Sequence, residues 1–301
     1  MNKQEFTDAR TGERCVRIDH PSGLTIFVYP KPDYASSYAV FTTRYGSIDN
    51  VFRIGDDAEE TAVPAGIAHY LEHKLFESED GDAFERYAAT GASANAFTSF
   101  DRTTYLFTCT GDVRPSLDIL LDFVQHPYFT EQTVQKEQGI IGQEIKMCND
   151  SPARCVFLNM LEGLYHTHPV RIDIAGTVAS IAEITPELLY GCYRSFYNLH
   201  NMVLAVSGRV TVEQVLEIAD KRLRPAADWS LARKTYDEPR TALRTRVEQA
   251  MPVAAPLFYL GFKDAVAPGE YPSPTREMAA DVLLDLIGGR SSALYARLME
   301  Q

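Results

Sequence analysis

Residues 66–77 read Gly-Ile-Ala-His-Tyr-Leu-Glu-His-Lys-Leu-Phe-Glu, and they carry the strongest chemical signal in the chain. Aliphatic residues recur every four positions within this stretch, which predicts a helix. His69 and His73 are also four residues apart, so their side chains share one face of that helix, about one turn apart. Two imidazoles in this arrangement can hold one metal ion between them.

Glu72 precedes His73 and lies on nearly the same face of the predicted helix. Its carboxylate could accept a proton from a water molecule bound to the metal. The order His-x-x-Glu-His arises by chance in roughly one percent of chains of this composition, so the motif alone is a hypothesis. The alternative is a surface helix with two half-exposed histidines and a solvated glutamate.

A catalytic zinc site needs a third protein ligand, and water takes the fourth position. A second predicted helix, over residues 131–147, offers three glutamates: Glu131, Glu137 and Glu144. Glu137 and Glu144 are seven residues apart and share one stripe of that helix, so one could bind the metal while the other supports a histidine. The spacing does not choose between them, and two solvated glutamates are an equally good interpretation.

Strands and helices both follow from the patterns around these motifs. Short alternating runs predict strands over residues 15–18, 25–29 and 38–45, and residues 91–110 read as a hairpin that turns at Asp101-Arg102. Further helices are predicted over residues 82–89, 113–125, 153–165, 177–183, 187–197 and 212–222.

Residues 226–252 differ in composition from the rest of the chain. They are charged and contain prolines and the only tryptophan, which is typical of a linker between domains. After them, a strand is predicted over residues 256–262 and a helix over residues 276–287. The roughly fifty residues from 253 to 301 are too few to form their own core, so we expect a second domain that is cut short or completed by another part.

The overall composition excludes several classes of protein. The chain has 301 residues, 41 of them acidic and 29 basic, and a net charge of −12. Phosphate contacts need a basic surface, so nucleic acid is not expected as a partner. The five cysteines are odd in number and form no Cys-x-x-Cys pair, which predicts reduced thiols and a cytoplasmic protein. No signal peptide and no apolar run of roughly 18 residues are present, so no membrane is expected.

The residues around the two histidines resemble the zinc-binding motif of the pitrilysin/insulinase family, in which His-x-x-Glu-His marks an inverzincin. The same resemblance extends to residues 95–99 (Asn-Ala-Phe-Thr-Ser), 103–105 (Thr-Thr-Tyr) and 136–145 (Lys-Glu-Gln-Gly-Ile-Ile-Gly-Gln-Glu-Ile). It covers roughly residues 20 to 301 and is strongest to bacterial insulinase-like and processing-peptidase-like proteins of about four hundred residues.

The resemblance implies an α+β fold in which helices pack on an antiparallel sheet, built as two similar halves. Residues 1–225 are then the zinc-binding half, 226–252 the linker, and 253–301 the beginning of a degenerate, incomplete second half. In the family the second half supplies an arginine and a tyrosine that help to grip the substrate. The segment that would carry them is missing here, and Arg290 and Tyr295 do not take that role. We therefore expect a fragment with weak or no peptidase activity on its own.

The resemblance also implies the roles of individual residues. One zinc ion per chain is expected on His69, His73 and Glu144, and Glu137 is expected to support a histidine in the catalytic centre. Glu72 is expected to take a proton from the zinc-bound water and to deliver it to the leaving amine.

In the family the substrate peptide lies as an added strand along a sheet edge, here the segment 95–98, and Asn95, Ala96 and Phe97 are expected to bind it. For Phe97, packing within the hairpin is an equally good interpretation. The implied function is a zinc endopeptidase acting on peptides or small unfolded proteins. The alternative is a non-catalytic scaffold or a partner subunit of a heterodimeric peptidase. The expected partners are a peptide substrate and either a second insulinase-like subunit or the missing C-terminal half.

Overall fold

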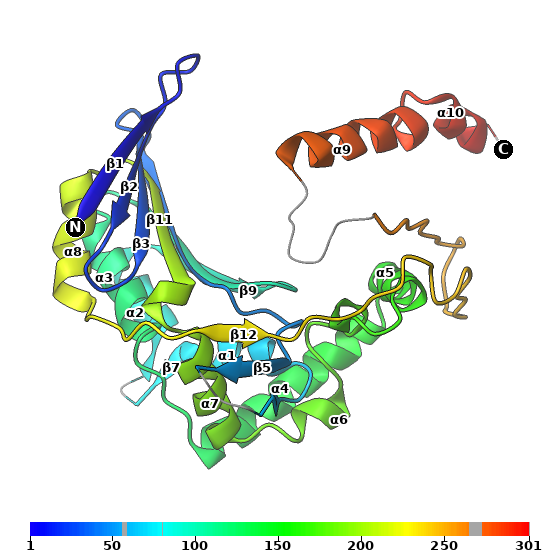
Figure 1. Cartoon of the computed structure of the whole chain (residues 1–301), viewed down its shortest axis with the longest axis horizontal. Helices are drawn as coiled ribbons and strands as arrows, with labels where there is room; N and C mark the ends of the chain where they lie inside the picture. Colours follow the sequence, from blue (N-terminus) through cyan, green and yellow to red (C-terminus); the bar gives the residue numbers. More distant parts are fainter. Residues whose placement is uncertain (56–58, 80, 265–272, 301) are drawn as a thin grey trace. The chain divides into compact units, whose positions relative to one another are not determined.

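The computed structural model describes residues 1–55, 59–79, 81–264 and 273–300, and Figure 1 shows the course of the chain. It divides into two units, Met1–Gly261 and Phe262–Gln301. The first unit has the expected α+β fold, with a seven-stranded sheet and helices packed on it. None of the described helices is both long enough and apolar enough to cross a bilayer.

The large sheet has the strand order β1-β2-β3-β11-β4-β10-β9. Its strands are β1 (Asn2–Thr7), β2 (Arg14–Asp19), β3 (Thr25–Pro30), β4 (Ser36–Thr43), β9 (Ser93–Thr98), β10 (Thr103–Thr110) and β11 (Met202–Gly208). Neighbouring strands are antiparallel except β3 and β11, which are parallel. Alternate residues of β4 and β11 are buried, because successive side chains of a strand point to opposite faces and one face packs on helices. In this strand order β9 is an edge strand, paired only with β10 among the described strands.

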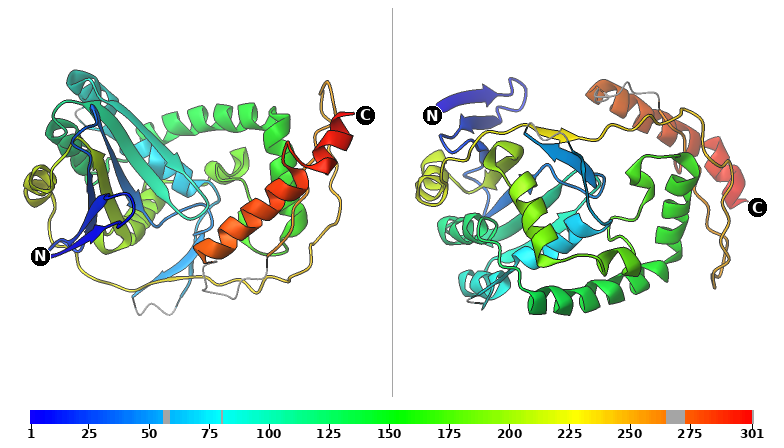
Figure 2. Two further views of the ribbon diagram at one scale, coloured as in Figure 1. Left: turned by 90° about the horizontal axis from the view of Figure 1, so that it is seen from above. Right: turned by 60° about the horizontal axis from the view of Figure 1, so that its bottom comes forward.

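Helices of the first unit position the histidine-containing segment. They are α1 (Ile67–Leu75), α2 (Ala83–Thr90), α3 (Arg114–Phe123), α4 (Glu131–Asn149), α5 (Pro152–Leu164), α6 (Val178–Ile181), α7 (Pro186–Phe196) and α8 (Val212–Arg222). α1 packs against β9, α4 and α7. α4 runs past α1, and α5 then continues in a different direction (Figure 2). The hairpin β9–β10 and the long helix α4 thus flank α1 from two sides.

Two glycines determine where α1 begins. Gly66 precedes the helix with φ of 93°, and a Cβ atom there would lie 2.5 Å from the carbonyl oxygen of Ala175. Gly176 has φ of 71°, and a Cβ atom there would lie 2.4 Å from the carbonyl oxygen of Ala65. The backbones of the two segments therefore cross with no room for a side chain on either glycine. The helix begins at Ile67, within the stretch of residues 66–77 for which it is predicted.

The segment over residues 226–252 is held against the rest of the first unit. Residues Leu231–Arg233 form β12, which pairs with β5 (Val51–Ile54), and β5 in turn pairs with β6 (Thr61–Ala62). Arg233 donates from Nε to the buried carboxylate of Asp49 at 2.8 Å. The amide of Arg244 donates to the carbonyl of Gly163 at 2.8 Å. Residues 226–252 therefore have the composition of a linker, and they also form backbone and side-chain hydrogen bonds with other segments of the first unit.

The strand predicted over residues 256–262 does not form. Leu257, Phe258 and Leu260 lie in irregular backbone with exposed side chains, and no partner strand adjoins them within the described ranges. High strand propensity cannot produce a strand when no neighbour satisfies its backbone hydrogen bonds. In the second unit, α9 (Pro274–Gly288) and α10 (Ala293–Met299) contain no buried residues among those described.

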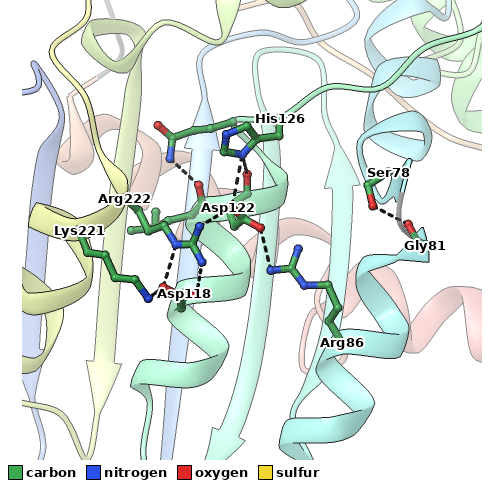
Figure 3. A network of polar contacts seen from close by, with 10 residues as sticks. Ser78, Gly81, Arg86, Asp118, Asp122, His126, Lys221 and Arg222 are labelled. Atoms are coloured by element: carbon green, nitrogen blue, oxygen red, sulfur yellow. Dashed lines mark hydrogen bonds and ion pairs between the residues drawn. The ribbon is translucent and has the colours of Figure 1, made fainter.

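An ion-pair network joins α3 to the helices on either side of it (Figure 3). The guanidinium of Arg222 in α8 donates to the carboxylate of Asp118 from Nε at 2.8 Å and to that of Asp122 from Nη1 at 2.7 Å. Lys221 donates to Asp118 at 2.9 Å, and Arg86 of α2 pairs with Asp122 at 2.8 Å. Asp118 and Asp122 are four residues apart and share one face of α3, so both can meet the same arginine.

We expect Asp118→Asn to destabilise the protein at neutral pH and to matter less in acid. Hydrogen bonds from Arg222 lower the pKa of Asp118 to about 2, burial opposes this, and Lys221 adds to the lowering. The carboxylate therefore stabilises the fold fully above the unfolded-state pKa of about 3.9, and this contribution is lost as pH falls toward 2. Urea unfolding should show a loss of about 1–2 kcal/mol at pH 7.

Asp112→Asn is the control for this prediction, because Asp112 pairs only locally with Arg114 on the surface and should matter little at any pH. A difference between wild type and Asp118→Asn that stays constant from pH 7 to pH 3 would contradict the prediction.

Candidate metal centre

The histidines of α1 and a glutamate of α4 meet at one point. The ring centroids of His69 and His73 are 4.6 Å apart. Glu144 places one carboxylate oxygen 3.7 Å from Nε2 of His69 and the other 3.6 Å from Nε2 of His73. One ligand atom from each of the three residues lies within 4.8 Å of the others, and no second such group of three occurs among the described residues.

This donor set fits a zinc ion. Distances of 3.6 and 3.7 Å between nitrogen and oxygen are too long for hydrogen bonds. Ligands placed tetrahedrally at about 2.1 Å from a zinc ion lie about 3.4 Å from one another, which is close to the separations found here. Two imidazole nitrogens and one carboxylate form a ligand set typical of catalytic zinc, with the fourth position open to water.

Glu137 lies on the other side of His73. Its Oε1 is 2.9 Å from Nδ1 of that histidine, so it orients the ring and leaves Nε2 directed to Glu144. Glu131, the remaining candidate, is exposed in the first turn of α4. The two glutamates, which the spacing left equivalent, thus have different surroundings. Glu144 faces Nε2 of both histidines, whereas Glu137 faces Nδ1 of His73.

The two histidines have opposite pKa shifts. Burial, followed by the positive charge of His73, lowers the pKa of His69 to about 4, so His69 is neutral at pH 7. Its Nδ1 is buried without a hydrogen-bond partner among the described residues. Burial also lowers the pKa of His73, but the hydrogen bond to Glu137 and the charges of Glu72, Glu137 and Glu144 outweigh it, and the net shift is upward.

Glu72 is buried beside the three candidate ligands, and its side chain accepts a hydrogen bond. Only 8% of this residue is exposed, and its Oε2 accepts a bond of 2.6 Å from the hydroxyl of Thr98. Burial raises the pKa of Glu72, the bond from Thr98 and the charge of His73 oppose the rise, and Glu144 adds to it. A raised carboxyl pKa suits a group that must both accept and donate a proton near neutral pH.

A cavity of about 560 Å³ opens beside Glu72 and His73. Asn95 and Ala96 of β9 line it, whereas Phe97 does not and is 42% exposed. Alternate side chains of a strand point to opposite faces, so Asn95 and Phe97 share the exposed face of β9 and Ala96 lies on the half-buried one, and the cavity reaches Asn95 but not Phe97. β9 has no strand beyond it among the described residues, which leaves its outer backbone edge open. Two of the three residues predicted to bind substrate therefore line the cavity.

Sequence reasoning placed Thr98 on the sheet edge but missed the contact of its side chain. It lies in the stretch Asn-Ala-Phe-Thr-Ser, but nothing in that stretch shows that its hydroxyl reaches Glu72. The bond depends on how the β9–β10 hairpin packs on α1, which spacing does not reveal.

Two family models cover most of the chain. Residues 51–178 match the model described as insulinase, peptidase family M16, and residues 183–301 match the one described as the peptidase M16 inactive domain. A crystal structure assigned as an M16-like peptidase from Alicyclobacillus acidocaldarius is 36% identical, with a TM-score of 0.84, and the match covers 99% of this chain and 68% of that one. This chain belongs to the M16 peptidase family.

Sequence relatives are named as a zinc protease and as a processing-peptidase subunit. "Uncharacterized zinc protease YmfH" of Bacillus subtilis is 46% identical over 93% of this chain and 66% of its own length. A protein of Arabidopsis thaliana assigned as the mitochondrial-processing peptidase subunit beta is 29% identical over 52% of this chain and 30% of its own length. The first curated relatives that this M16 chain matches are longer, and it spans about half to two thirds of their length.

Glu137→Gln is expected to weaken zinc binding without abolishing it. The amide keeps the shape of the side chain but loses the negative charge that makes His73 a better ligand, and such changes cost about 10–100-fold in metal affinity. Competition with a fluorescent zinc chelator measures the loss. Glu131→Gln on the same helix is the control and should leave the affinity unchanged. Equal affinities of wild type and Glu137→Gln would show that Glu137 does not support the metal site.

Proposed function

We propose that this chain carries the catalytic centre of a zinc endopeptidase that acts on peptides or small unfolded proteins. One observation carries the proposal: Nε2 of His69, Nε2 of His73 and the carboxylate of Glu144 converge next to the buried carboxylate of Glu72. Bound zinc would lower the pKa of a water molecule and polarise a peptide carbonyl.

The chain's own side chains would do the remaining work. Glu72 takes a proton from the attacking water and delivers it to the amine that leaves, as a general base and then a general acid. Glu137 holds His73 in the orientation that directs Nε2 to the metal. The open edge of β9 pairs with the backbone of the substrate, and this favours extended, unfolded polypeptides over folded proteins.

A second candidate function is a non-catalytic scaffold or partner subunit. It is favoured by the match of residues 183–301 to an M16 model named for inactivity. Under either function, a second M16 subunit or a further part of the protein would contribute to substrate binding. The five free cysteines make the cytoplasm the expected compartment.

Cleavage of an unfolded polypeptide by the zinc-loaded protein separates the two candidates. Reduced and carboxymethylated α-lactalbumin should be cut slowly, the cutting should stop with 1,10-phenanthroline, and added zinc should restore it. Intact α-lactalbumin after prolonged incubation with equimolar zinc-loaded protein would favour the scaffold. Cleavage that persists in the chelator would point to a contaminating peptidase and contradict the proposal.

A further inference from the structure

Thr98 links the open edge of the sheet to the carboxylate of Glu72. It is the last residue of β9, opposite Thr103 of β10. Its Oγ1 donates to Oε2 of Glu72 at 2.6 Å, which is in the range of short, charge-assisted bonds between a hydroxyl and a carboxylate. The backbone of Thr98 thus belongs to the strand edge, while its side chain reaches the buried acid.

This bond engages one of the two oxygens of Glu72. Among the described residues no hydrogen-bond donor is recorded for Oε1, and Glu72 is among the residues that line the cavity. The terminal torsion of a glutamate is broad, so a buried carboxylate without a fixed partner would sample several orientations. The hydroxyl of Thr98 removes that freedom and leaves Oε1 as the oxygen available to a water molecule.

We propose that Thr98 is a positioning residue that holds Glu72 for proton transfer and connects it to the strand on which the peptide lies. The inference rests on the proposed function and deepens it. A peptide strand added to β9 fixes the backbone of that strand, and Thr98 transmits this restraint to Glu72 through one side chain. Thr98 thus holds Glu72 before the peptide binds, and peptide binding adds a further restraint on the strand that carries Thr98.

The affinity of a dipeptide hydroxamate tests Thr98 without relying on turnover. A hydroxamate would bind the metal as its anion: the O–H bond breaks, the electron pair stays on oxygen, the N–O bond is kept, and the proton passes to the general base. Thr98→Val removes the donor and keeps the shape, and it should weaken the hydroxamate about tenfold, which equals about 1.4 kcal/mol. Thr98→Ser restores the donor and should bind within about threefold of wild type.

A double-mutant cycle shows whether Thr98 acts through Glu72. Glu72→Gln alone should weaken the hydroxamate, and adding Thr98→Val should weaken it little further, because the group that Thr98 positions is already gone. Where turnover is measurable, Thr98→Val should lower kcat and leave KM unchanged. Thr42→Val is the matched control: its hydroxyl bonds Thr104 at 2.9 Å in the same sheet, and its removal should change neither quantity.

Other results of these measurements would contradict the positioning role of Thr98. Equal weakening by Thr98→Val in both backgrounds, or failure of Thr98→Ser to restore affinity, would show a packing role and overturn the positioning role. A rise in KM alone would assign Thr98 to strand pairing only. If Glu72→Gln itself leaves the hydroxamate affinity unchanged, the proposed function fails, and the role of Thr98 fails with it.

Discussion

Glu72→Gln is expected to abolish peptide hydrolysis while one zinc ion stays bound to each chain. The amide has the size of the carboxylate, and its oxygen can still accept the hydrogen bond from Thr98, so the fold around it should survive. It cannot accept a proton from water. General acid–base groups contribute about 10²–10⁴-fold to the rate, so the rate of hydrolysis by the variant should be lower than that of wild type by about this factor.

The measurement compares initial rates on a fluorogenic unfolded peptide with zinc content from the same samples. Glu79→Gln is the control, since this exposed carboxylate lines the same cavity and is not recorded as a partner of the candidate ligands. Unchanged turnover in Glu72→Gln would place the base elsewhere. Loss of zinc together with activity would show that Glu72 has a role in metal binding.

His73→Ala is expected to remove the zinc ion. Wild-type protein should contain one zinc per chain by mass spectrometry, and the variant should contain none after gel filtration. The change removes one of three candidate ligands and leaves the carboxylates of Glu137 and Glu144 without the ring they share. Two remaining donors cannot complete the site of a catalytic zinc.

His126→Ala provides the matched control for the loss of a histidine. The side chain of His126 is 70% exposed near the end of α3 and belongs to no group of candidate ligands among the described residues. Its removal should leave the zinc content at one per chain. Zinc retained by His73→Ala would show that the ion binds elsewhere, and wild-type protein that takes up no zinc from solution would favour the scaffold function.

The sequence predicts the local part of the site better than the part that depends on packing. The four-residue spacing places His69, Glu72 and His73 on one helix, and the structure forms that helix as α1. The spacing could not choose between Glu137 and Glu144, because both lie on one stripe of α4. The choice depends on which turn of α4 packs against the two histidines of α1. That contact is set by tertiary packing and cannot be derived from the sequence of either helix alone.

The misses in the fold have a similar cause. All residues of β1 are exposed, so it has no alternation of apolar and polar positions to detect. β5 and β6 are short, and they flank a stretch of acidic residues that indicates a loop. The run over residues 256–262 has strong strand character, but no strand in the described part of the chain pairs with it. Pairing between distant segments, rather than propensity, decides these elements.

The crossing of residues 65–66 with residues 175–176 makes the candidate metal centre sensitive to mutation at positions that contribute no candidate ligand. Any side chain at Gly66 or Gly176 collides with the opposite carbonyl, and the segments can separate only by moving the start of α1. His69 follows Gly66 by less than one turn, so such a movement reaches the first imidazole directly. A screen for temperature-sensitive alleles should therefore recover these two codons, and the mutant phenotype should be relieved by zinc in the growth medium.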